Sequence, residues 1–174
     1  LGASPQAVPS QRDHGQSGTD YHLVQSLEEL DALVAHLRAA PAFAFDVEST
    51  SLKPTEARLV GVSISAAPGV AWYIPLGHIT GKCLPLEGSL ARLKPLLEDP
   101  KGARVAHNGG YDISVLANHG VRVPSVAFDT MIAAHLLNEK SLGLKALAFS
   151  KLGAEMTPIE ALIGKGSKQI TMAQ

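Results

Sequence analysis

Residues 42–48 read Ala-Phe-Ala-Phe-Asp-Val-Glu, an apolar run that ends in two carboxylates. The apolar run predicts a buried β-strand. Because successive side chains of a strand point to opposite faces, Asp46 and Glu48 are expected to project from the same face. Two adjacent carboxylates repel each other, and burying them without a cation is costly. A divalent metal ion between them resolves this conflict, and oxygen-only ligands favour magnesium or manganese. The ordinary alternative is an acidic strand end at the solvent boundary.

The segments around this strand predict a mixed α/β domain. Further strands are expected at 21–25, 58–66, 70–74, 103–106 and 126–128, and helices at 27–40, 86–97, 111–118, 130–137, 144–152 and 158–163. Ala-Pro-Gly at 67–69 is a turn sequence, so the strands on either side of it should form an antiparallel hairpin. A hairpin followed by alternating strands and helices indicates a mixed sheet with helices on its faces. Residues 168–174 look like the beginning of another helix.

Length and composition narrow the class of protein. The chain has 174 residues, 45% of them hydrophobic, which is enough for one domain with a sizeable core. Residues 1–19 are rich in Ser, Gln, Gly and Pro, so we interpret them as a flexible linker or an artificial chain end, and place the domain at 20–174. A net charge of -1 argues against a protein that binds long duplex DNA through positive charge alone. Cys83 is the only cysteine, which fits a reducing compartment.

A second acidic motif follows the strand expected at 103–106. Residues 105–112 read Val-Ala-His-Asn-Gly-Gly-Tyr-Asp, in which an apolar strand leads through a glycine pair into a helix. Asp112 falls in the first helical turn, where the helix dipole favours an anion, and this structural role is common. Asn108 has an ordinary interpretation as a turn former. Asp129 is predicted to be the N-cap of the helix at 130–137, and we prefer that role to metal ligation.

Taken in order and spacing, these motifs resemble the proofreading exonuclease domain of bacterial DNA polymerase I, the family A DNA polymerases. The likeness includes Phe-Asp-Val-Glu-Ser-Thr-Ser-Leu at 45–52, Pro-Gly-Val-Ala-Trp-Tyr-Ile-Pro at 68–75 and the N-x-x-Y-D pattern of Asn108, Tyr111 and Asp112. Phe-Asp-Thr-Met at 128–131 and Ile-Gly-Lys-Gly at 163–166 also match family segments. The resemblance covers about residues 21–174, which is most of the chain.

The resemblance implies a fold and a chemistry. The fold is RNase H-like, with a five-stranded mixed sheet flanked by helices. Asp46, Glu48 and Asp112 would be the catalytic residues and would bind two divalent metal ions, Mg²⁺ or Mn²⁺. The implied reaction is 3′→5′ hydrolysis of phosphodiester bonds at a single-stranded DNA 3′ end.

The same resemblance implies DNA contacts and partners. Leu52 would wedge against the terminal base, and Ser49, Asn108 and Tyr111 would line the single-strand cleft. A polymerase domain would follow in the same parent chain, and the protein would work in the bacterial cytoplasm near the nucleoid, without a membrane.

One departure from the family pattern keeps alternatives open. The family's third motif, Y-x-x-x-D, lies beyond the segment that matches residues 169–174. We therefore expect a domain truncated before that motif, with an incomplete and inactive site in the isolated fragment. A non-catalytic remnant of the exonuclease domain and a free-standing exonuclease resembling RNase D are the two alternatives. The residues downstream of Gln174 would distinguish them.

Overall fold

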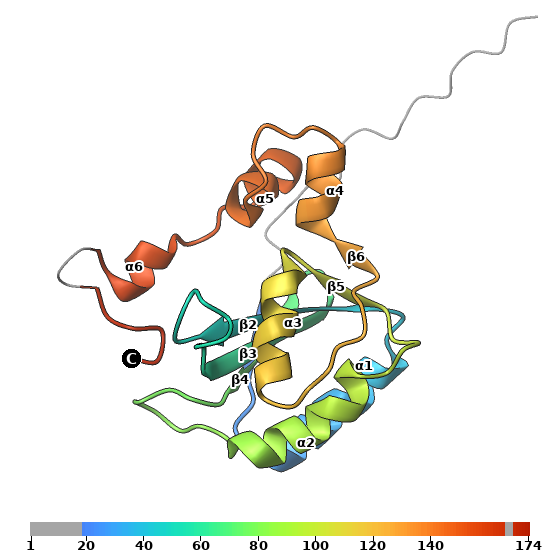
Figure 1. Ribbon diagram of the computed structural model, residues 1–174, viewed down its shortest axis with the longest axis vertical. Helices are drawn as coiled ribbons and strands as arrows, with labels where there is room; N and C mark the ends of the chain where they lie inside the picture. The colour runs from blue at the N-terminus through green and yellow to red at the C-terminus, as the bar shows by residue number, and fades with distance from the viewer. Residues whose placement is uncertain (1–18, 166–168) are drawn as a thin grey trace, which may run out of the picture.

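The protein is built on a six-stranded mixed sheet (Figure 1). The computed structural model describes residues 19–165 and 169–174, so the expected linker lies outside the described residues except for Thr19. The strands are β1 (Asp20–Leu23), β2 (Phe43–Ser49), β3 (Leu59–Ala67), β4 (Val70–Pro75), β5 (Arg104–Ala106) and β6 (Phe128–Asp129), in the order β1-β4-β3-β2-β5-β6. The strands β2, β3 and β4 pair antiparallel, and the other pairs are parallel. The predicted mixed sheet is confirmed, with six strands where the resemblance implies five.

Helices flank this sheet. They are α1 (Leu27–Ala39), α2 (Leu86–Leu97), α3 (Gly109–Asn118), α4 (Thr130–Leu136), α5 (Leu144–Leu152) and α6 (Ile159–Ile163). Figure 1 shows α1 and α2 side by side and α3 against the sheet, while α4, α5 and α6 lead away from it. None of the helices in residues 19–165 and 169–174 is both long and apolar enough to cross a bilayer.

The expectation of a helix at 168–174 is wrong for the residues that the structure describes there. Residues 169–174 contain a turn, and residues 166–168 lie outside the described part of the chain. The Ile79 N–H donates to the Ala173 carbonyl oxygen at 2.6 Å, and Ala173 is buried. In a helix, the Ala173 carbonyl oxygen would accept from an N–H group of the same helix; here the loop after β4 supplies the donor instead.

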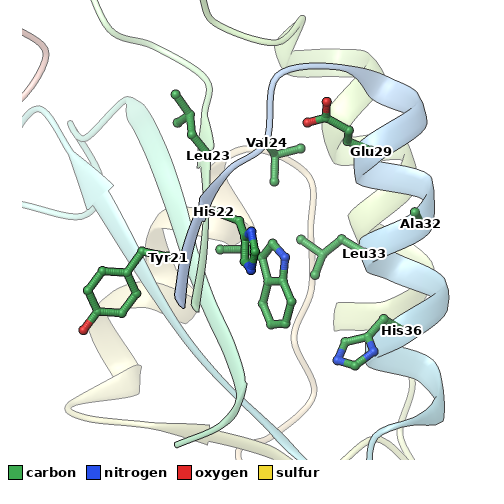
Figure 2. Close-up of a pocket in the computed structure, with 9 residues that line it drawn as sticks. Tyr21, His22, Leu23, Val24, Glu29, Ala32, Leu33 and His36 are labelled. Carbon is green, nitrogen blue, oxygen red and sulfur yellow. The ribbon is translucent and has the colours of Figure 1, made fainter. Parts of the chain in front are cut away.

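The start of α1 is capped by side chains from its own first turn and the residue before it. Ser26 Oγ accepts a hydrogen bond from the Glu29 N–H at 3.1 Å, which is half of a capping box. The Glu29 carboxylate reaches back to the Gln25 N–H, one residue earlier than the motif predicts. Between α1 and β1 lies a hollow in which His22 stacks on Trp72, with ring centroids 5.5 Å apart (Figure 2). Because Trp72 belongs to β4, the hollow lies over β1 and β4, and β3 lies between these strands and β2.

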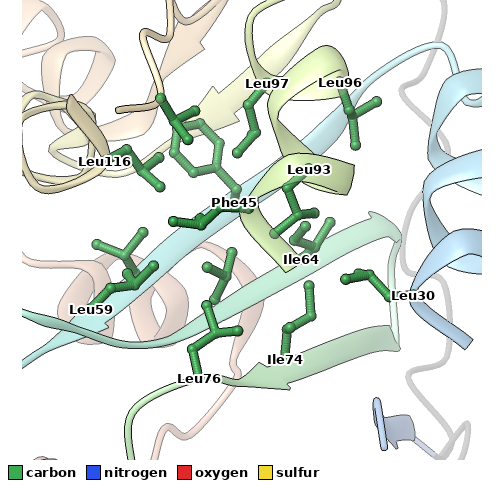
Figure 3. Packing of buried hydrophobic residues seen from close by; sticks show 14 of the residues in the cluster. Leu30, Phe45, Leu59, Ile64, Ile74, Leu76, Leu93, Leu96, Leu97 and Leu116 are labelled. Atoms are coloured by element: carbon green, nitrogen blue, oxygen red, sulfur yellow. The ribbon is translucent and has the colours of Figure 1, made fainter. Parts of the chain in front are cut away.

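The hydrophobic core lies between the sheet and the helices α1, α2 and α3. Phe43, Phe45 and Val47 of β2 are buried and point into it, as the strand alternation predicts. Figure 3 shows Phe45 among leucines and isoleucines from neighbouring strands and from α2 and α3, including the fully buried Leu93. Because alternate residues must point the other way, Asp46 and Glu48 project from the opposite face of the sheet.

Candidate metal centre

The candidate site lies where β2 extends past the end of β5. The parallel ladder between these strands ends with the pair Ala44 and Val105, and β5 itself stops at Ala106. The chain then turns directly into α3, whose first turn carries Asp112. The Val47 N–H donates to Asp112 Oδ1 at 2.9 Å. The Asp112 carboxylate therefore occupies the place beside β2 that a longer β5 would have filled, next to Asp46 and Glu48.

The three carboxyl groups disfavour one another's ionised form. Asp46 is exposed to solvent on the open face of β2, but the protein around its carboxyl group partly desolvates it. This desolvation, together with the negative charge of Glu48, raises the pKa of Asp46 to about 6. Burial and the charge of Asp112 raise the pKa of Glu48. Burial also raises the pKa of Asp112 to about 6, with a contribution from Asp46, although the Val47 N–H bond acts in the opposite direction. The site thus concentrates negative charge in a partly desolvated place.

The surrounding residues do not neutralise this charge. Among the ion pairs of residues 19–165 and 169–174, none involves Asp46, Glu48 or Asp112. Within the same residues, no three acidic, histidine or cysteine side chains are arranged so that they enclose a metal ion. The donor chemistry fits a hard divalent cation, because all three groups offer carboxylate oxygens. Convergence of the three on one cation stays a prediction.

The structure places the residues with expected DNA contacts around the same rim. The Tyr111 hydroxyl hydrogen-bonds to Ser49 Oγ and donates to the Ser51 carbonyl oxygen, so it ties α3 to the end of β2. Leu52, on the following loop, is 95% exposed. Asn108 is exposed and has a φ of 61°, in the left-handed region that asparagine tolerates. Leu52 and Asn108 are accessible to a ligand, whereas Ser49 and Tyr111 bond to each other.

Sequence reasoning missed a neighbour of Glu48. Tyr73 of β4 lies over Gly61 of β3, the residue that pairs with Glu48 across the sheet. The Tyr73 hydroxyl hydrogen-bonds to His78 Nε2 at 2.6 Å. Burial and the nearby Glu48 charge raise the pKa of Tyr73 to about 12. The sequence pattern predicted a strand at 70–74, but nothing in it indicated that Tyr73 lies near Glu48.

Replacing Gly61 with alanine is expected to destabilise the fold by about 1–3 kcal/mol. A Cβ at this position would lie 2.1 Å from the Tyr73 hydroxyl oxygen, so the ring must move away from its present packing beside His78. Urea unfolding of the variant measures the loss. Combining Gly61→Ala with Tyr73→Ala should cost less than the sum of the two changes, because the second change removes the clash. An unaltered unfolding free energy for Gly61→Ala would contradict this packing.

Asp129 has the capping role that the sequence predicts. Its Oδ1 accepts hydrogen bonds from the N–H groups of Met131 and Ile132 at the start of α4. The same carboxylate also accepts from the N–H groups of Asn108 and Gly109 at the start of α3, which the sequence did not indicate. Burial favours the protonated form of this carboxyl group, but the four donors outweigh burial and hold the pKa of Asp129 below its ordinary value.

Comparison with known proteins defines the class. A family model described as 3′-5′ exonuclease matches residues 21–174. The chain belongs to this 3′–5′ exonuclease family. Among curated proteins, it is similar to DNA polymerase I of Chloroflexus aurantiacus, with 46% identity over 154 residues. That alignment covers 87% of this chain and 16% of the polymerase, so the chain spans less than a fifth of this relative.

Solved structures confirm the RNase H-like fold class. NrnC of Brucella melitensis with bound Mg²⁺ matches with a TM-score of 0.59 and 26% identity, over 80% of this chain and 64% of that chain. RNase D of Escherichia coli matches with a TM-score of 0.64 and 22% identity, over 82% and 36% of the two chains. Enzymes of this family generally depend on divalent metal ions and act on nucleic acid. Domains of this kind occur in DNA polymerase I chains.

Proposed function

We propose that residues 20–174 form the 3′→5′ proofreading exonuclease domain of a bacterial DNA polymerase I. The observation that carries this proposal is the hydrogen bond from the Val47 N–H to Asp112, which holds a third carboxyl group at the end of the strand that bears Asp46 and Glu48, in a chain of the 3′–5′ exonuclease family. The substrate is the 3′ end of single-stranded DNA. The polymerase activity belongs to another part of the parent chain, which works in the cytoplasm at the nucleoid.

The three carboxylates would hold two divalent ions, Mg²⁺ or Mn²⁺. Such a pair supplies an activated water and stabilises the leaving oxygen of an in-line displacement. The chain's own contribution is rigidity. Asp46 and Glu48 are fixed by the ladder between β2 and β3, and Asp112 is fixed by its bond to the Val47 N–H. The pKa values of Asp46 and Asp112 are raised, so a bound cation would stabilise the ionised form of these carboxyl groups.

The nucleotide would lie beside this cluster. Leu52 is almost fully exposed on the loop after β2, so its side chain is free to pack against the terminal base. Tyr111 and Ser49 hold that loop to α3, which keeps Leu52 at a fixed place relative to Asp112. Asn108, at the start of α3, offers an exposed amide for hydrogen bonds to the strand.

Two alternatives receive less support. A non-catalytic remnant would have no need of three carboxylates that repel one another in a partly buried place, and this chain keeps all three. The likeness to RNase D shows the fold alone, whereas the likeness to DNA polymerase I extends to 46% of aligned residues. The polymerase context is therefore the better supported one.

Manganese binding tests the proposal. In a titration followed by electron paramagnetic resonance, the chain is expected to bind Mn²⁺ with Mg²⁺ as a competitor, and Asp112→Asn is expected to weaken binding. The change is nearly isosteric but removes a charged ligand. An absence of Mn²⁺ binding by the wild-type chain at millimolar concentration would count against the metal centre. Cleavage of a 3′-labelled single-stranded oligonucleotide by the full-length natural protein then tests the direction of the reaction.

A further inference from the structure

One buried carboxylate joins the starts of two helices. Asp129, 8% exposed at the end of β6, accepts hydrogen bonds from the N–H groups of Met131 at 2.8 Å and Ile132 at 3.3 Å in α4. It also accepts from the N–H groups of Asn108 at 3.1 Å and Gly109 at 2.8 Å at the start of α3. The first pair is ordinary N-capping within one segment. The second pair connects segments about twenty residues apart in sequence.

The helix α3 depends on this contact because its own N-cap residue does not cap it. Asn108 occupies the N-cap position with a left-handed backbone, and its side chain makes no capping hydrogen bond. The first N–H groups of any helix lack partners within the helix. Asp129 supplies a partner from β6 for the first of these, the Gly109 N–H, and for the N–H of Asn108 just before it. It also places a negative charge at the helix N-terminus, where the dipole favours it.

The first residue of α3 also packs closely against the end of β5. A Cβ added to Gly109 would lie 2.7 Å from the Cβ of Ala106, so α3 begins closer to β5 than a side chain would allow. Asp112 follows Gly109 by three residues, within the first turn of the helix. Any displacement of this turn therefore moves the Asp112 carboxylate relative to Val47 and to the other two carboxylates.

We propose that Asp129 is a positioning residue for the exonuclease reaction: its carboxylate holds the first turn of α3 in place and thereby sets Asp112 beside Asp46 and Glu48. The proposal rests on the proposed function, in which those three carboxylates hold the metal ions. It goes beyond capping of α4, because it assigns to Asp129 an effect on metal affinity and on the rate of hydrolysis. Groups that orient metal ligands from outside the ligand set commonly affect affinity in this way.

Asp129→Ser separates the two roles of the carboxylate. The serine hydroxyl still caps α4, but it is too short to reach Asn108 and Gly109. We expect the affinity of the chain for Mn²⁺ to fall about tenfold. In the full-length protein, kcat for 3′-end cleavage should fall while KM for DNA changes little, because Leu52 is untouched. Raising the Mn²⁺ concentration should restore part of the rate.

Thr130→Ala is the matched control. Thr130 Oγ1 hydrogen-bonds to His107 Nδ1 at 2.8 Å and to the Ala106 carbonyl oxygen at 3.3 Å, so the change weakens the same junction between β5 and α4. Thr130 makes no hydrogen bond to the start of α3 within the described residues. We expect this variant to lose stability and to keep the Mn²⁺ affinity of the wild type.

The outcomes distinguish this inference from the proposed function. If Asp129→Ser loses stability as Thr130→Ala does but keeps its Mn²⁺ affinity and kcat, Asp129 is only a structural cap and the inference is wrong. If the wild-type chain binds no Mn²⁺, the proposed function fails instead. A crystal structure of Asp129→Ser then decides the positioning role by itself, through the separation of Val47 N and Asp112 Oδ1. An unchanged separation overturns the inference, and a longer one supports it.

Discussion

Replacing Asp46 with alanine is expected to reduce 3′-end hydrolysis by the full-length protein about a thousandfold, which corresponds to ~4 kcal/mol of transition-state stabilisation. The reason is that Asp46 offers carboxylate oxygens on the open face of β2, beside Glu48 and within the influence of Asp112. The measurement is single-turnover release of nucleotides from a 3′-labelled oligonucleotide.

The same substitution should not weaken the fold. The raised pKa of Asp46 means that its ionised form is less favourable in the folded chain than in the unfolded one. Removing it is therefore expected to leave the free energy of unfolding at pH 7 unchanged or higher. Ser63→Ala is the matched control, because Ser63 pairs with Asp46 across the sheet on the same face. Ser63→Ala should keep the activity of the wild type. If Asp46→Ala then keeps more than a tenth of that activity, Asp46 has no part in the reaction.

Mn²⁺ is expected to raise the melting temperature of the chain by about 5–10 °C at pH 7.5 when it is present at a hundred times its Kd. Such an excess of a ligand that binds only the folded state adds about 2.7 kcal/mol to the free energy of unfolding. The ligands must be ionised, so the effect should disappear near pH 4.5, below the pKa of about 6 of Asp46 and Asp112.

The metal-free chain should show the opposite trend with pH. Both carboxyl groups have a pKa of about 6 in the folded chain against an ordinary 3.8, so the folded chain binds more protons between these values. Its free energy of unfolding should therefore fall as the pH rises from about 4 to 6. Asp129 has a lowered pKa and acts in the other direction, below that window. Calorimetry with chelator and with Mn²⁺ at both pH values tests this, and equal stabilisation by Mn²⁺ at pH 4.5 and 7.5 would contradict carboxylate ligation.

The elements of the fold were predictable because their signals are local. The apolar run at 42–48 predicted β2, and strand geometry assigned Asp46 and Glu48 to one face. The turn at 67–69 predicted the pairing of β3 with β4. Residues 169–174 were mispredicted as a helix. There the Ala173 carbonyl oxygen accepts a hydrogen bond from the Ile79 N–H of a distant loop, and no pattern within residues 169–174 reveals that contact.

The site was only partly predictable, because its contacts join distant segments. Residue chemistry alone left Asp112 as a group that compensates a helix dipole, and only the family resemblance added it to Asp46 and Glu48. The bond from the Val47 N–H to Asp112 spans 65 residues, and it arises because β5 stops early. The second cap made by Asp129 and the position of Tyr73 over Gly61 depend on the same kind of packing between segments.

The hydrogen bond from Val47 to Asp112 gives this protein a natural spectroscopic probe. An amide proton that bonds to a carboxylate shifts its nuclear magnetic resonance signal when that carboxylate titrates or gains another partner. The Val47 resonance in an ¹⁵N-labelled sample should therefore follow the charge state of one chosen acid, at one place, without any dye or substitution. Arrival of cations at the rim could then be watched in solution while the rest of the spectrum serves as its own reference.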